Sequence, residues 1–189
     1  EAPDRGHGHG IYTQNQTGTK KIIDNIFFSG FAHGIHVYGS TSAPLDNYDI
    51  EGNTTFNAGN LSANGGRNLL LGGGSVAHNP IVKDNLLYRA VSPSDDLNLG
   101  YSGGCANATV SGNYVASVTA FVNCVPSILT DNTFYGSISG LSESQFVANT
   151  YLAARPTGMK VFVRPNAYEP GRANITVYNW DGADSVDVD

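Results

Sequence analysis

Charge is scarce in this chain. Charged residues make up 14 % of the 189 residues, and the formal net charge is −6. A sparse and acidic charge excludes a general affinity for nucleic acid or for an anionic membrane surface, because both partners select basic surfaces. Apolar runs are also short: none approaches the roughly 18–20 residues of a membrane-spanning helix, so we expect no membrane span.

The sequence also lacks the pattern of a helical protein. No segment repeats apolar residues at the helical period over a long stretch. The residues that recur are Val, Ile, Phe, Tyr, Thr, Asn and Gly, which favour strands and turns. A helical solenoid is therefore excluded, and an all-β fold is expected.

One asparagine phrase returns six times. Each copy has an apolar residue, two spacers, an asparagine and usually an aromatic residue three positions later. The asparagines are Asn25, Asn53, Asn85, Asn113, Asn132 and Asn149, and the residues in the aromatic position are Phe28, Phe56, Tyr88, Ala116, Tyr135 and Leu152. The asparagines are separated by 28, 32, 28, 19 and 17 residues, and such a period with variable insertions indicates a solenoid.

A second phrase with strand character recurs between the asparagine phrases. Its copies are Gly10–Thr13, Gly34–Val37, Asn68–Leu71, Asp96–Leu99 and Ala120–Asn123. Two strand phrases per repeat predict a parallel β-helix of about six coils, roughly 4.8 Å apart. We expect each repeat asparagine to adopt the αL conformation at a tight turn and to stack its amide on the next one. The aromatic position, including Tyr88 and Tyr135, is expected to lie in the core.

The repeat ends near residue 152, which divides the chain into a β-helix over residues 1–152 and a small β-module over residues 153–189. Both ends of the chain interrupt a repeating pattern, so we expect a piece of a longer protein. Long insertions between phrases predict loops that build a binding cleft, at Ser40–Asn47, Asn57–Arg67 and Ala90–Asp95. Antiparallel strands are predicted in the module at Lys160–Arg164, Asn174–Tyr178 and Ser185–Asp189.

The two cysteines test the predicted coil register. Cys105 and Cys124 each lie eight residues before a repeat asparagine. They should therefore lie on adjacent coils, with Cα atoms about 4.8 Å apart. That distance suits a disulfide, which would indicate an exported protein. It equally suits two buried thiols.

Chemically active side chains gather in the first coils. The predicted register aligns them in two neighbouring columns, His9–His33–Arg67–Asp95 and Tyr12–His36–Leu70–Asn98. Such side chains on one surface can transfer protons and neutralise an anion, and Lys20, Lys21 and Lys83 could add positive charge.

Other interpretations of the same residues stay open. His9 and His33 could simply cap strand starts and bond to turn backbone. The imidazoles also suit zinc or copper, but strand alternation predicts that His33 and His36 face opposite sides, so we predict no metal site. Asp95 and Asp96 form a carboxylate pair of the kind that glycosidases use, although a solvated loop is expected there.

The asparagine and Gly-Ile phrases resemble those of right-handed parallel β-helix proteins of the pectate-lyase-like superfamily, over roughly residues 6–152. Gly8-His9-Gly10-Ile11 and the segment Ala32–Ser40 look like the Gly-His-Gly strand of polygalacturonase-like glycoside hydrolases. The resemblance implies an extracellular polysaccharide substrate. For a lyase it implies β-elimination on a uronate, with Ca²⁺ or an arginine neutralising the carboxylate.

The functional hypothesis is a secreted, cell-surface or periplasmic polysaccharide-active β-helix protein, with a uronate lyase as the first expectation. The alternatives are a polygalacturonase-like hydrolase and a non-catalytic glycan-binding β-helix. Ca²⁺ could be a cofactor of the lyase, and no residue is assigned to a metal. The expected catalytic residues are His33, His36, Tyr12 and Arg67, and the expected substrate-binding residues are His9, Lys21, Tyr38, Asp95 and Asn98.

Overall fold

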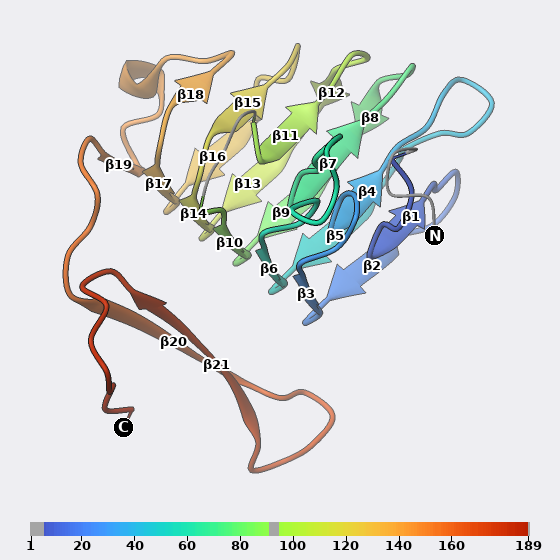
Figure 1. The fold of residues 1–189 in the computed structure, drawn as a ribbon. Coiled ribbons are helices and arrows are strands. Elements are labelled where there is room, and N and C mark those ends of the chain that lie inside the picture. Colours follow the sequence, from blue (N-terminus) through green and yellow to red (C-terminus); the bar gives the residue numbers. More distant parts are fainter. Residues whose placement is uncertain (1–5, 91–94, 189) are drawn as a thin grey trace. The chain divides into compact units, whose positions relative to one another are not determined.

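The computed structural model describes residues 6–90 and 95–188. Its regular structure is almost entirely β-strand, apart from the one-turn 3-10 helix η2 (Glu143–Gln145). Short strands stack in register into three parallel sheets, and Figure 1 shows this stack from β1 to β19. The chain therefore folds as the parallel β-helix that its repeat predicts.

Each sheet is named here after its first strand. The β1 sheet contains β1 (Ile11–Thr13), β4 (Ile35–Val37), β7 (Leu69–Gly72), β11 (Leu97–Gly100), β15 (Thr119–Phe121) and β18 (Ile138–Ser139). The β2 sheet contains β2 (Lys20–Ile23), β5 (Tyr48–Glu51), β9 (Ile81–Lys83), β13 (Thr109–Ser111) and β16 (Ile128–Thr130). The β3 sheet contains β3 (Ile26–Phe28), β6 (Thr54–Phe56), β10 (Leu86–Tyr88), β14 (Tyr114–Ala116), β17 (Thr133–Tyr135) and β19 (Thr150–Leu152). A short extra pair consists of β8 (Ala77–His78) and β12 (Cys105–Ala106).

A coil contains three main strands, not the two that the sequence predicted. The asparagine phrase supplies two of them, because β2 precedes Asn25, β3 follows it, and the two strands belong to different sheets. The turn predicted at the asparagine is therefore a corner that moves the chain from one sheet to the next.

Aliphatic columns fill the interior of the β-helix. Ile35 pairs with Leu69, Leu69 pairs with Leu97, and all three side chains are fully buried. The next interior column lies two residues later and includes Val37, Leu71 and Leu99. Because side chains alternate along a strand, the residue between these two columns faces outward. The candidate site is built from those outward positions.

The six repeat asparagines form a ladder along one corner. Oδ1 of Asn85 accepts the backbone N–H of Asn53 at 3.0 Å and its Nδ2 at 2.9 Å. The same pair of bonds joins every step from Asn25 to Asn149. This confirms the predicted stacking of side-chain amides.

The αL conformation at this corner belongs to the residue before the asparagine, so its assignment to the asparagine itself is wrong. φ is 56° at Asp24 and 53° at Asp84, and glycine takes the equivalent position at Gly52 and Gly112. The asparagine turns its amide inward, where Nδ2 of Asn53 donates to the carbonyl of Ile22 at 2.8 Å. Asparagines in αL occur at a different corner, where Asn47, Asn79 and Asn107 form an exposed amide ladder.

The aromatic position faces outward, so the placement of Tyr88 and Tyr135 in the core is wrong. The interior position is one residue earlier and is filled by fully buried Leu87 in β10. Both tyrosines are partly exposed. In the first two coils the residues at this position, Phe28 and Phe56, stack on the outer surface with ring centroids 5.3 Å apart.

Two of the predicted loops lie between strands as expected. Arg89 holds the loop at 57–67, since its Nη2 donates to the carbonyls of Ala58 at 2.5 Å and Gly66 at 2.6 Å. The middle of the predicted loop 90–95, residues 91–94, lies outside the described residues. Over the part of the chain that is described, no helix is long and apolar enough to cross a membrane.

Residue contacts divide the chain into two units, with the boundary between Tyr151 and Leu152. In the second unit, β20 (Met159–Pro165) and β21 (Ala173–Asn179) form an antiparallel hairpin. The predicted third strand, Ser185–Asp189, does not form over its described residues 185–188. Val186 and Val188 are 37 % and 39 % exposed, so their alternation does not correspond to a buried face.

Candidate functional site

Two neighbouring columns on the outside of the β1 sheet bring most of the candidate residues together. In one column Tyr12 pairs with His36, His36 with Leu70, and Leu70 with Asn98. In the other, the rings of His9 and His33 stack with centroids 5.3 Å apart and nearly parallel planes. The second column continues through Arg67 and Asp95. Both columns confirm the predicted register.

Glycine beside each stacked histidine has a packing explanation. A Cβ atom on Gly34 would lie 2.4 Å from Cγ2 of Thr55 and 2.8 Å from the carbonyl oxygen of Asn68. Only glycine fits where the bend before β4 approaches the neighbouring backbone this closely. The Gly-His-Gly phrase is therefore explained by packing, and by itself it does not indicate hydrolase chemistry.

The three histidines His9, His33 and His36, called the histidine cluster below, meet on the same outer surface. His36 has its ring centroid 4.3 Å from that of His33 and 4.3 Å from that of His9. The expectation that His33 and His36 face opposite sides is wrong. His33 lies two residues before β4, in irregular backbone where strand alternation does not apply.

Hydrogen bonds assign one tautomer to each ring of the cluster. Nδ1 of His33 accepts the backbone N–H of Arg67 at 2.8 Å, and Nδ1 of His9 accepts that of His33 at 3.2 Å. A neutral imidazole has one N–H, so both rings carry it on Nε2. Nε2 of His9 then donates to Nδ1 of His36 at 3.2 Å, which leaves the N–H of His36 on Nε2 as well. The predicted bonding of His9 and His33 to turn backbone is thus observed.

The cluster is held in its neutral form. The pKa of His33 is lowered to about 4, mainly by burial and further by the neighbouring His9, Arg67 and Arg89, although Asp95 acts in the opposite direction. Burial and the neighbouring His33 and His9 lower the pKa of His36 to about 3. The pKa of His9 is lowered by burial and by His7. At neutral pH these rings are uncharged hydrogen-bonding groups.

The same hydrogen bonds oppose metal binding. One nitrogen from each of the three rings could approach a common point, since the ligand atoms lie within 4.8 Å of one another. A metal on Nε2 of His9 or His33 would move the remaining N–H to Nδ1. There it would face a backbone N–H, whereas a ligating histidine needs an acceptor at its second nitrogen. The donor set therefore fits a resident metal ion poorly.

Aromatic rings extend the cluster along the sheet. Tyr12 meets His36 edge to face at 5.0 Å, His36 lies 5.2 Å from Tyr38, and Tyr38 lies 6.0 Å from Tyr101. Leu70, the next residue of the His36 column, is only 2 % exposed. We call this continuous set the aromatic face; it comprises His9, Tyr12, His33, His36, Tyr38 and Tyr101.

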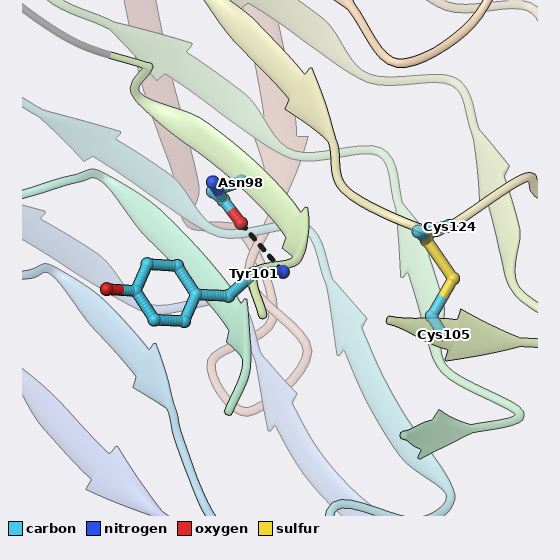
Figure 2. Close-up of a disulfide and its surroundings, with 4 residues drawn as sticks. All are labelled: Asn98, Tyr101, Cys105 and Cys124. Atoms are coloured by element: carbon cyan, nitrogen blue, oxygen red, sulfur yellow. Dashed lines mark hydrogen bonds between the residues drawn. A yellow bond between two sulfur atoms is a disulfide. The ribbon is translucent and has the colours of Figure 1, made fainter. Parts of the chain in front are cut away.

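Tyr101 was missed by the sequence analysis. It has φ of 36°, which is unusual for a non-glycine residue and is typical of strained positions at ligand sites. Figure 2 shows its backbone N–H donating to Oδ1 of Asn98, at 3.0 Å. The same turn leads to Cys105, which forms a disulfide with Cys124 across adjacent coils, with Cα atoms 4.6 Å apart. The disulfide alternative is thus the one observed.

A polar edge borders the aromatic face and consists of Arg67, Asp95 and Asn98. Arg67 forms two bonds to the carboxylate of Asp95, at 2.8 and 2.9 Å, and its guanidinium lies 5.7 Å from the ring centroid of Tyr101. Nδ2 of Asn98 also donates to Asp95. Burial alone would raise the pKa of Asp95, but the bonds from Arg67 and Asn98 outweigh it and lower the pKa.

Asp96 is a structural residue rather than a solvated loop carboxylate, so that expectation is wrong. It is fully buried and pairs with Nε of Arg89 at 2.7 Å. It also accepts the backbone N–H of Asn68 at 2.9 Å and the hydroxyl of Ser117 at 2.9 Å. These bonds fix the loop ends behind the polar edge and leave Asp96 no free oxygen for a substrate.

Lys21 is not part of this surface. It lies in β2, in a different sheet, where its side chain is 64 % exposed and its Nζ lies 3.9 Å from Asp49. Lys83 lies in β9 of the same sheet and pairs with Glu51 and Asp84. Strand alternation could not locate these lysines, because the sequence did not reveal that the asparagine phrase lies in two other sheets.

A cavity of about 250 Å³ adjoins the aromatic face. His9 and His33 form part of its wall, and Phe27, Phe28 and Ala58 provide an apolar part. The candidate site thus combines a hollow beside the histidine cluster with exposed rings along the sheet.

Comparisons of the chain with protein families, with curated proteins and with solved structures find no match. We therefore infer the function from the geometry of the site.

Proposed function

We propose that this β-helix binds a polysaccharide along the aromatic face. The observation that carries the proposal is the unbroken series of ring contacts from His33 through His36 and Tyr38 to Tyr101, which extends from the coil of β4 to the coil of β11. Successive coils of a β-helix are about 4.8 Å apart, close to the length of one sugar unit. A linear glycan could thus contact several coils at once.

The chemistry of the face suits sugars. The C–H faces of sugar rings pack against tyrosine rings, of which Tyr12 is 53 % exposed and Tyr101 is 36 % exposed. Sugar hydroxyls need both donors and acceptors. The Nε2–H groups of His33 and His36 are donors, and the carboxylate of Asp95 is an acceptor.

The arrangement favours binding over glycoside hydrolysis. Hydrolases of this class use two carboxyl groups that face the glycosidic bond. Asp95 is bound by Arg67 and Asn98, and its neighbour Asp96 is buried in a structural ion pair. The carboxyl groups of Asp95 and Asp96 are therefore not arranged as the general acid and the general base of a hydrolase.

It also favours binding over β-elimination. A lyase needs a base with a free lone pair, but Nδ1 of each cluster histidine already accepts a hydrogen bond. Arg67, the expected partner of a substrate carboxylate, is already paired with Asp95. A lyase would have to break these interactions first. The Cys105–Cys124 disulfide is consistent with an exported protein in an oxidising compartment.

Glycan affinity tests the proposal. Binding of a panel of soluble polysaccharides would be measured by affinity electrophoresis and titration calorimetry, for the wild type and for Tyr101→Ala. We expect the variant to bind several-fold to about tenfold more weakly, the effect of one packed ring. Tyr168→Ala is the matched control, since this tyrosine is 84 % exposed and lies in the hairpin unit.

Two outcomes would contradict the proposal. One is the absence of measurable affinity across the panel. The other is an equal loss of affinity in both tyrosine variants. Product formation would be followed in the same samples, as absorbance of an unsaturated uronate and as new reducing ends. An increase in absorbance would replace the binding hypothesis by a lyase. New reducing ends without that absorbance would replace it by a hydrolase.

A further inference from the structure

The charges beside the aromatic face are matched within the protein. Arg67 and Asp95 form a two-bond ion pair, with side chains that are 22 % and 18 % exposed. Behind them Arg89 and Asp96 form a second pair that is almost completely buried. Each guanidinium is therefore already paired with a carboxylate of the protein.

The histidine cluster adds no positive charge. A second proton on His33 or His9 would have to enter at Nδ1, where a backbone N–H already points. A second proton on His36 would meet the Nε2–H of His9 in the same way. Three imidazoles that look like a cationic patch in the sequence are thus neutral donors in the fold.

The nearest lysines in the described part of the chain are directed elsewhere. Nζ of Lys20 donates to the hydroxyl of Thr13 at 3.1 Å and to the carbonyl of Gln14 at 2.8 Å. That hydroxyl lies on the inner side, 3.5 Å from the OH of fully buried Tyr48. Lys21 lies in the β2 sheet beside Asp49. Arg5 lies outside the described residues.

We infer that the aromatic face selects neutral glycans over uronate-containing or sulfated ones. The inference rests on the proposed glycan-binding function and narrows its substrate class. Among the described residues of this face an anionic sugar would meet no unpaired cation, and it would approach the ionised carboxylate of Asp95. A neutral sugar could use Asp95 as an acceptor and the imidazole N–H groups as donors without losing solvation of a charge.

A pair of ligands that differ only in charge tests the inference. Polygalacturonate and alginate would each be compared with the carboxyl-reduced neutral polymer made from it, together with neutral glucans and xylan. We expect the wild type to bind the neutral member of each pair about tenfold more tightly, or more. Tighter binding of the uronates at physiological salt would overturn the inference while leaving glycan binding intact.

A substitution should reverse the preference. Asp95→Asn keeps the shape of the side chain but removes the charge that pairs with Arg67, so uronate affinity should rise about tenfold, as expected when a charge-assisted hydrogen bond becomes available. Asp49→Asn is the matched control, since it removes the same charge beside Lys21 on another sheet. An equal rise in both variants would indicate a general charge effect and would overturn the inference. If no glycan binds to any of these proteins, the proposed function itself fails.

Discussion

The asparagine ladder predicts that the cost of losing an asparagine depends on its place in the stack. Asn85 lies in the middle and is fully buried. Its Oδ1 accepts two bonds from Asn53, and its Nδ2 donates to the carbonyl of Ile50 at 2.9 Å and to Asn113 at 3.0 Å. Asn25 lies at the first step of the ladder, where no described residue donates to its Oδ1.

The magnitudes follow from the groups left without partners. Asn85→Ala leaves the buried backbone N–H of Asn53 without its acceptor and removes the bond that Nδ2 donates to the carbonyl of Ile50, while Oδ1 of Asn113 keeps the backbone N–H of Asn85. One buried unsatisfied group at about 1–3 kcal/mol and one lost hydrogen bond at about 0.5–1.5 kcal/mol predict a loss of about 2–4 kcal/mol. Asn25→Ala removes two donated bonds from a partly exposed corner, where water can replace them, and should cost only about 0.5–1.5 kcal/mol.

Urea unfolding followed by far-UV circular dichroism measures both variants. This signal is chosen because it reports on the strands of the β-helix directly, whereas the only tryptophan, Trp180, belongs to the second unit. Equal losses for Asn85→Ala and Asn25→Ala would refute the argument, because they would mean that the ladder contributes only local turn stability. A decrease in the free energy of unfolding of less than about 1 kcal/mol for Asn85→Ala would also refute it, because one ordinary hydrogen bond contributes that much.

Three further outcomes are expected from the same structure. Asp96→Asn breaks a buried ion pair and should lower the free energy of unfolding by about 3–5 kcal/mol in urea titrations. Serine at both Cys105 and Cys124 opens a 19-residue loop and should cost about 3 kcal/mol, seen as a lower thermal midpoint. Because the pKa values of His33 and His36 are lowered to about 4 and 3, the unfolded state takes up their protons first, so stability should fall as pH drops from about 6.5 toward 4. His33→Gln should flatten the pH dependence of the urea midpoint, and an unchanged slope would contradict the burial argument.

The parallel β-helix could be predicted from the sequence because each copy of the repeat corresponds to one coil. A fixed asparagine phrase requires stacked coils, and aligning the copies of the second strand phrase placed Tyr12 with His36 and Leu70 with Asn98, as observed. The number of strands per coil could not be predicted in this way. The sequence indicates a turn at each asparagine, but no residue pattern shows that this turn moves the chain from one sheet to another.

The sequence predicts the site residues whose place depends on the register of the coils. It does not predict those whose place depends on local backbone conformation. His9, His33, Arg67 and Asp95 follow from register alone. Tyr101 depends on a left-handed backbone conformation, a bond that its N–H donates to Asn98 and a nearby disulfide, none of which a repeat alignment encodes. The neutrality of the histidines is likewise invisible in the sequence, because burial and the backbone N–H groups that face their Nδ1 atoms determine it.

The location of the site along the β-helix follows from the lengths of the coils. The outward column begins with Tyr12 and His36 and ends in Ala120 and Ser139, which are too small to bind a ligand by themselves. The number of residues between successive repeat asparagines decreases in the same direction along the chain, from 28 and 32 to 19 and 17. Long coils have room for the loop at 57–67 that leads into Arg67, whereas the short coils contain little beyond their strands and corners. Large outward side chains and long connections therefore occur together in this chain, and together they form the candidate site.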